Sequence, residues 1–99
     1  MNVIYKTKSL KKICTNASEA RKKYGKNISD KIHQRIGEIR AADTVNNLVL
    51  WHIGRCHALT GNRQGQYAMD VSPNYRLIFK IIDDEIQIAE IMEISDYHG

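Results

Sequence analysis

Three successive strands are predicted by residues 66–94, which read QYAMDVSPNYRLIFKIIDDEIQIAEIMEI. Residues 66–71 alternate with a period of two, which puts Tyr67, Met69 and Val71 on one face. In the next strand the core-facing set is Tyr75, Leu77, Phe79 and Ile81, and the outward set is Arg76, Ile78 and Lys80. Turn residues at 72–74 and 83–85 separate the strands, so the segment predicts an antiparallel meander whose last strand is 86–94.

The chain before this meander predicts a short strand and two amphipathic helices. Residues 3–6 favour a strand, and residues 9–24 follow helical spacing as far as Gly25, which ends the pattern. Ser29 is expected to be the N-cap of a second helix, whose buried face carries Ile32, Ile36 and Ile39. After a short turn that begins at Thr44, residues 55–59 favour a further strand, and 61–65 is a hairpin signal with two glycines.

These elements predict an α+β fold, with an N-terminal strand and a helical hairpin packed on one face of a mainly antiparallel four- to five-stranded sheet. The 99 residues suit a single domain, 1–99. We find no apolar run of 18 residues and no apolar signal segment, so we expect a cytoplasmic protein that does not contact a membrane. Cys14 and Cys56 are expected to be small buried hydrophobes of a reduced protein, and Trp51 a core anchor.

Charge is distributed unevenly along the chain. Residues 1–26 hold eight lysines and arginines against Glu19 alone, a net charge of +7, so the other 73 residues carry −3 of the total of +4. A basic lobe on a mildly acidic body favours a polyanionic partner, because a lysine beside a phosphate releases condensed counterions. A solvated helix face is the commoner use of such lysines, so charge alone favours nucleic acid only slightly.

Groups that can exchange a proton follow the last strand, in the order Asp96, Tyr97 and His98. The open face of the sheet should display Arg76 and Lys80, joined by Arg55 and His57 if their strand parity matches. An imidazole titrates near pH ~6.5, and an arginine can hold a phosphate through two parallel hydrogen bonds. The combination predicts metal-free RNA cleavage, in which a base takes the 2′-hydroxyl proton, an arginine stabilises the phosphorane and an acid protonates the departing 5′-oxygen.

Other chemistries have less support in the sequence. Cys56 and His57 are adjacent in a predicted strand and therefore point to opposite faces, and no CxxC or HxxxH spacing supports a zinc site. There is no GxSxG, GxGxxG or P-loop motif. We therefore expect no metal and no cofactor, and we expect His33 and His52 to be surface or hydrogen-bonded core residues.

Three motifs, read together, carry a family resemblance. They are the turn at 61–66 that follows His57 (Gly-Asn-Arg-Gln-Gly-Gln), the strand start at 74–76 (Asn-Tyr-Arg) and the ending at 96–98 (Asp-Tyr-His). The chain resembles the HigB toxin family, also called plasmid-maintenance killer proteins, of the RelE/ParE superfamily, and the resemblance covers essentially its whole length. It implies a RelE-like fold and the toxin of a type II toxin–antitoxin system, a ribosome-dependent endoribonuclease that cuts mRNA in the decoding site.

The resemblance also implies partners and site positions. The partners are a HigA-like helix-turn-helix antitoxin, the ribosome with its mRNA, and operator DNA only through the antitoxin complex. The family's active-site positions fall on His57, Arg76, Asp96, Tyr97 and His98. Thr60 stands where family members often carry a lysine, and Arg63, Arg55 or Lys80 are candidates to replace that cation. The residues expected to contact RNA or the ribosome are Lys11, Lys12, Lys22, Lys23, Arg55, Arg63 and Lys80.

Two other functions stay open at this point. One is a ParE-like poison that binds DNA gyrase without catalysis, and the other is a catalytically weak partner of the antitoxin and the operator. The tail at 96–98 favours the nuclease, because a gyrase-binding protein has no chemical use for it, whereas Thr60 keeps the weak partner in consideration. The base and acid are not assigned by the sequence, although His98 or Asp96 as base and His57 as acid or phosphate ligand is the preferred arrangement.

Overall fold

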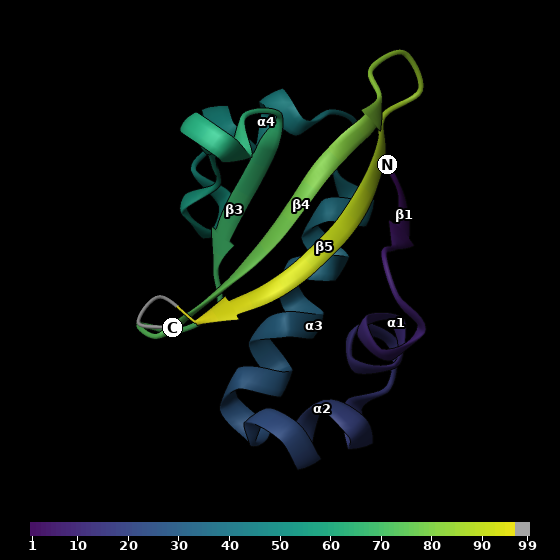
Figure 1. Ribbon diagram of the computed structural model, residues 1–99, viewed down its shortest axis with the longest axis vertical. Coiled ribbons are helices and arrows are strands. Elements are labelled where there is room, and N and C mark those ends of the chain that lie inside the picture. The colour runs from purple at the N-terminus through teal and green to yellow at the C-terminus, as the bar shows by residue number, and fades with distance from the viewer. Residues whose placement is uncertain (97–99) are drawn as a thin grey trace.

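The computed structural model describes residues 1–96 and confirms the expected α+β architecture. Its sheet has five strands in the order β1-β5-β4-β3-β2 (Figure 1). The strands are β1 (Asn2–Tyr5), β2 (His57–Ala58), β3 (Gln66–Asp70), β4 (Tyr75–Asp83) and β5 (Ile88–Asp96). Only the β1–β5 pair is parallel, and the other three pairs are antiparallel.

The helices precede most of the sheet in the chain, and α1 to α3 lie together beside it (Figure 1). They are α1 (Lys8–Thr15), α2 (Ala17–Tyr24), α3 (Lys26–Ala41) and α4 (Val45–Leu50), followed by the 3₁₀ turns η1 (Ile53–Arg55) and η2 (Gly61–Arg63). Within residues 1–96, none of these helices is long and apolar enough to cross a bilayer.

The first helical segment differs from the prediction of one helix over 9–24. Asn16 ends α1 and caps α2, because its side-chain oxygen accepts hydrogen bonds from the backbone N–H of Ser18 and Glu19. The expected N-cap at Ser29 is also wrong. Helix α3 begins directly after Gly25, which has φ 84°, and Ser29 is fully buried inside the helix, where its hydroxyl donates to the carbonyl of Ala17.

Three predictions for the middle of the chain need correction. Residues 45–50 form α4 instead of a turn, and the strand expected at 55–59 is reduced to His57–Ala58. Trp51 is not a core anchor, since it follows the last turn of α4 and is 67% exposed. The last strand is shifted two residues, to Ile88–Asp96, so that Asp96 belongs to the sheet rather than to a tail.

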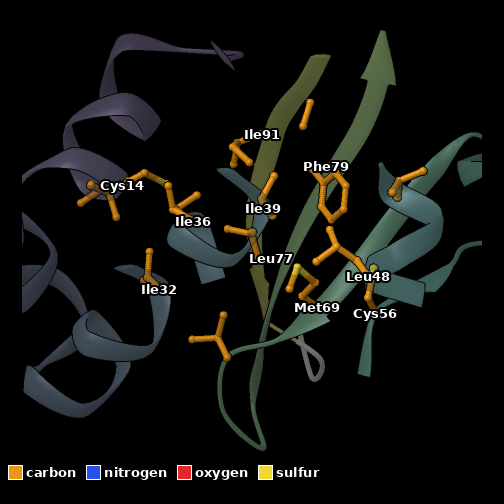
Figure 2. Packing of buried hydrophobic residues seen from close by; sticks show 14 of the residues in the cluster. Cys14, Ile32, Ile36, Ile39, Leu48, Cys56, Met69, Leu77, Phe79 and Ile91 are labelled. Carbon is orange, nitrogen blue, oxygen red and sulfur yellow. The ribbon is translucent and has the colours of Figure 1, made fainter. Parts of the chain in front are cut away.

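The predicted alternation of β3 and β4 is confirmed by the core. Leu77, Phe79 and Met69 are fully buried and share one apolar cluster with Ile36 and Ile39 of α3, as Figure 2 shows. Cys14 and Cys56 belong to the same cluster, as expected. Burial raises the pKa of both thiols to about 12, so each behaves as a small neutral hydrophobe at neutral pH.

The core and the exposed tryptophan allow a direct test of this fold. We expect Phe79→Ala to lower the free energy of unfolding by about 3–5 kcal/mol, because Phe79 is fully buried at the centre of the sheet. Trp51→Ala should change it by no more than about 0.5 kcal/mol. Urea denaturation followed by circular dichroism measures both, and a large loss with Trp51→Ala would contradict the exposed position of that side chain.

Candidate active site

The sheet face opposite the helices carries the candidate site, and strand register fixes which residues share it. Directly paired residues of antiparallel strands point to the same side. One row across this open face runs His57, Ala68, Ile78 and Glu93. The next row runs Asp70, Arg76 and Ser95, and another runs Gln66, Lys80 and Glu90. The prediction that Arg76, Lys80 and His57 share one face is therefore confirmed, whereas Arg55 lies in the 3₁₀ turn η1 before β2 and in no strand of the sheet.

The ring of His57 is held by the backbone of Arg55, two residues earlier. Its Nδ1 lies 2.9 Å from the carbonyl oxygen of Arg55. Because a carbonyl oxygen can only accept, Nδ1 is the donor, and the lone pair of the neutral ring is on Nε2. The side chain is exposed, so Nε2 is available to a substrate.

The turn before His57 has an unusual backbone. His52, Gly54 and Arg55 all have positive φ, at 53°, 56° and 55°. Residues other than glycine rarely adopt this conformation, which costs about 1–2 kcal/mol each. In this conformation the carbonyl group of Arg55 points at Nδ1 of the His57 ring. The strain is therefore located where an imidazole is being oriented.

Arg35 supports this turn and was not anticipated from the sequence. Its side chain is only 12% exposed; Nε donates to the carbonyl of Asp70 at 2.7 Å, and Nη1 is paired with Glu38 at 2.7 Å. An added Cβ on Gly54 would lie 2.6 Å from Arg35 Nε. Arg35 thus connects α3, the end of β3 and the turn before His57. The available signal was its spacing, three positions after Ile32 and four before Ile39 on the buried face.

Arg76 is half-buried in β4, between Asp70 and Ser95 of the neighbouring strands. Asp70 also contacts Arg55, with Oδ2 at 3.5 Å from Nε. His57 is two strands away from Arg76 across the sheet and two residues away along the strand. With standard strand spacings, this offset corresponds to roughly 12 Å between the Cα atoms. A phosphodiester lying between the two side chains could contact both.

Two further cations on the open face are engaged by acidic residues of β5. Arg63 Nη2 lies 2.7 Å from Glu93 Oε1, and Nη1 donates to Gln66 Oε1 at 3.1 Å. Since Gln66 is on β3 and Glu93 on β5, Arg63 crosses above β4, and Ile78 beneath it is fully buried. Lys80 Nζ lies 3.5 Å from Glu90 Oε1. The sequence identified these cations but not their partners.

Two hollows lie near the β1 side of the sheet and share Lys6. The first, of about 410 Å³, is lined by Lys6, Asn62, Arg63, Gln66, Met92 and Glu93. The second, which we call the β1 hollow, has a volume of about 480 Å³. It is lined by residues 3–8 together with Lys11, Thr15 and Arg40. Among residues 1–96, its lining has four cations, Lys6, Lys8, Lys11 and Arg40, and no acidic residue.

The remaining predicted RNA contacts lie on the helical layer. Lys12 is exposed on α1, and Lys22 and Lys23 are exposed on α2. Lys22 is 3.9 Å from Glu19, and Lys23 lies 5.5 Å from the centre of the Tyr24 ring. The structure therefore separates the predicted cations into an open-face set and a helical set, with the β1 hollow at the edge of the sheet.

The predicted proton-exchanging tail is only partly described. Asp96 is the last residue of β5, is exposed and pairs with Tyr75, beside the turn that joins β3 to β4 (Figure 1). Tyr97 and His98 lie outside the described residues. Among residues 1–96, no group of three or more His, Cys, Asp or Glu side chains is placed to hold a metal ion.

Solved structures place the fold in a known class. The chain superimposes on a YoeB/ParE toxin from Agrobacterium tumefaciens with a TM-score of 0.67 at 14% identity, covering 98% of this chain and 99% of that one. It matches the YoeB–YefM complex from Staphylococcus aureus with a TM-score of 0.65 at 19% identity, covering 100% and 98%. YafQ from E. coli gives 0.64 at 17% identity, covering 98% and 93%. The chain therefore shares its fold with these YoeB, ParE and YafQ proteins.

Sequence comparison narrows this class to one family. The model described as the RelE-like toxin of type II toxin–antitoxin system HigB matches residues 4–98. Endoribonuclease HigB from Proteus vulgaris is 32% identical over 69 residues, which cover 70% of this chain and 71% of that protein. The chain belongs to the HigB-like toxin family.

The turn before His57 can be tested with two glycines of one chain. Gly54→Ala should lower the free energy of unfolding by about 1–3 kcal/mol, because it imposes a side chain at φ 56° and displaces Arg35. Gly37→Ala is the matched control, since Gly37 lies in α3 with nothing within 4 Å of an added Cβ, and it should stabilise by about 0.5–1 kcal/mol. Chemical denaturation of both variants measures this, and equal effects would refute the role given to Gly54.

Proposed function

We propose that this toxin is a ribosome-dependent mRNA endoribonuclease that inhibits translation. The observation that supports it most is the placement of His57, whose Nε2 is open to solvent on the face that also carries Arg76. An oriented imidazole beside an arginine suits acid–base chemistry on a phosphodiester. The family relationship to endoribonuclease HigB supports the same activity.

The reaction follows from these groups. The 2′-oxygen loses its proton to His98 or Asp96 and attacks the adjacent phosphorus. The P–O2′ bond forms as the P–O5′ bond breaks, and the departing 5′-oxygen takes the Nε2 proton of His57, which must therefore be in its imidazolium form at this step. Arg76 stabilises the charge on the phosphorane, and Tyr97 stacks on a base or donates to the phosphate. The products are a 2′,3′-cyclic phosphate and a 5′-hydroxyl, and the step needs no external reactant.

The ribosome supplies the positioning that a small protein with few base-reading groups lacks. Ribosomal RNA would contact the β1 hollow and the exposed lysines of α1 and α2, because the lining of the hollow includes four cations and no acidic residue. A toxin of a type II system has a cognate antitoxin, and we expect a HigA-like helix-turn-helix protein that connects the complex to operator DNA. We expect all of these partners in the cytoplasm.

Mapping mRNA 5′ ends on purified translating ribosomes tests the nuclease. The wild type should cut translated messages, and Arg76→Ala and His57→Ala should each slow cleavage by about 10²–10³-fold, the usual effect of losing one group that stabilises a transition state. Lys31→Gln, on the outer part of α3, is a control that should cut normally. Growth arrest with intact mRNA, unaltered by either site variant, would favour a gyrase-directed or binding-only toxin.

The β1 hollow makes a separate prediction about ribosome binding. The double variant Lys8→Gln/Arg40→Gln should weaken binding to empty ribosomes and lower the slope of log affinity against log salt by about 1 for each cation lost. Cleavage at saturating ribosome should change little, since neither residue lies on the open face. Unchanged binding over a salt series would exclude the hollow as a ribosome contact.

A further inference from the structure

Two groups of cations described above, the pairs on the open face and the lining of the β1 hollow, differ in their internal partners. On the open face, Arg63 is paired with Glu93 at 2.7 Å and Lys80 with Glu90 at 3.5 Å. In the β1 hollow, the lining contains four cations and no carboxylate. The two ion pairs therefore add little positive electrostatic potential to the open face. The β1 hollow, by contrast, has a positive potential that attracts anions.

Glu93 reaches the open face only because β5 is irregular. Ile78 pairs with Glu93 but Phe79 pairs with Ile91, so Met92 is an extra residue in β5. Regular alternation from the core-facing Ile91 would have turned Glu93 toward the core as well. The bulge reverses the parity of the strand and places a carboxylate beside the guanidinium of Arg63, which is how bulges re-aim side chains.

We propose that Glu93, aided by Glu90, is an internal competitor for RNA phosphate, which keeps the open face closed to free RNA and lets it accept mRNA held by the ribosome. This inference rests on the proposed function and adds a basis for its ribosome dependence. Glu93 is a positioning residue here, because it acts on the substrate through Arg63.

The energetics of the pair suit such an exchange. The side chains of Arg63 and Glu93 are 41% and 40% exposed, and the buried Oε1 of Glu93 faces Arg63 without a well-aligned hydrogen bond, so the pair is weakly held. A phosphodiester carries the same single negative charge as the Glu93 carboxylate, but its two non-bridging oxygens can both accept from Arg63, whereas Glu93 contacts Arg63 through Oε1 alone. Free RNA competes with Glu93 for Arg63 only at the bulk concentration of the RNA. A message already bound on the ribosome presents its phosphate to Arg63 at a much higher effective concentration. Both residues line the 410 Å³ hollow on the open face, so an entering phosphate would meet Arg63 directly.

Binding of a non-cleavable 2′-O-methyl oligonucleotide to the purified full chain tests the idea. Fluorescence anisotropy over a salt series should show weak binding by the wild type and binding about 3–10-fold tighter by Glu93→Gln. The slope of log affinity against log salt should steepen by about 0.7, the value for one additional phosphate contact on a single strand. Glu85→Gln is the matched control, since Glu85 is exposed in the β4–β5 turn and its loss changes the net charge equally.

The double variant Arg63→Gln/Glu93→Gln separates a released arginine from a simple change in net charge. The proposal requires that the gain from Glu93→Gln disappears when Arg63 is absent. It is overturned if Glu85→Gln tightens binding as much as Glu93→Gln, or if the gain persists in the double variant. A structural role for the pair would instead make Glu93→Gln bind more weakly and melt at lower temperature, which also overturns the proposal.

Two further measurements keep the result interpretable. Glu90→Gln repeats the test at Lys80 and should give a smaller gain, because the 3.5 Å pair is looser than the 2.7 Å pair. A larger gain from Glu90→Gln than from Glu93→Gln would overturn the assignment of Glu93 as the main competitor. Cleavage on ribosomes is measured separately, so a toxin that binds the oligonucleotide as predicted but leaves mRNA intact would contradict the nuclease and not the ion-pair exchange.

Discussion

The packing of Leu77 and Phe79 against the isoleucines of α3 is the constraint on which the rest of the structure depends. Side chains of a strand alternate, so burying these two residues turns Arg76, Ile78 and Lys80 to the other face. A slip of one residue in β4 would exchange the two sets and bury an arginine in the core. The register of β4 with β3 and β5 then decides which residues join Arg76. Packing on one face of the sheet thus assembles the chemistry on the other.

The sequence predicted the parts of the fold that have a strong period. Alternation in 66–81 assigned both faces correctly, and helical spacing found the buried face of α3. Prediction from the sequence failed where a capping signal interrupted a helical pattern or where a segment was too short to show a period. Asn16 interrupts a stripe that looks continuous, because its side chain caps α2. The segment after Thr44 was predicted to be a turn, but residues 45–50 form the short helix α4, which leaves Trp51 exposed beyond its end.

The candidate site was predictable as a set of residue types but not as a set of interactions. His57 and Arg76 could be proposed from the sequence, since parity places both on the open face. The orientation of the His57 ring depends on left-handed backbone at Arg55 and on Arg35, which reaches the end of β3 from a helix 35 positions away. The ion pair between Arg63 and Glu93 depends on one extra residue in β5. Neither bulges nor long-range side-chain contacts have a period that could be read from the sequence.

The positions of the charges suggest how a protein with a net charge of only +4 could discriminate between free and positioned RNA. The four cations of the β1 hollow lie at the sheet edge, where binding to a large polyanion is governed by charge. Cations near the reacting phosphate are matched by carboxylates, so contact there requires exchange of one partner for another. Long-range attraction and local exchange then act in sequence. On the proposed arrangement, affinity comes from the β1 hollow, and the open face responds only to a phosphate that is already in place.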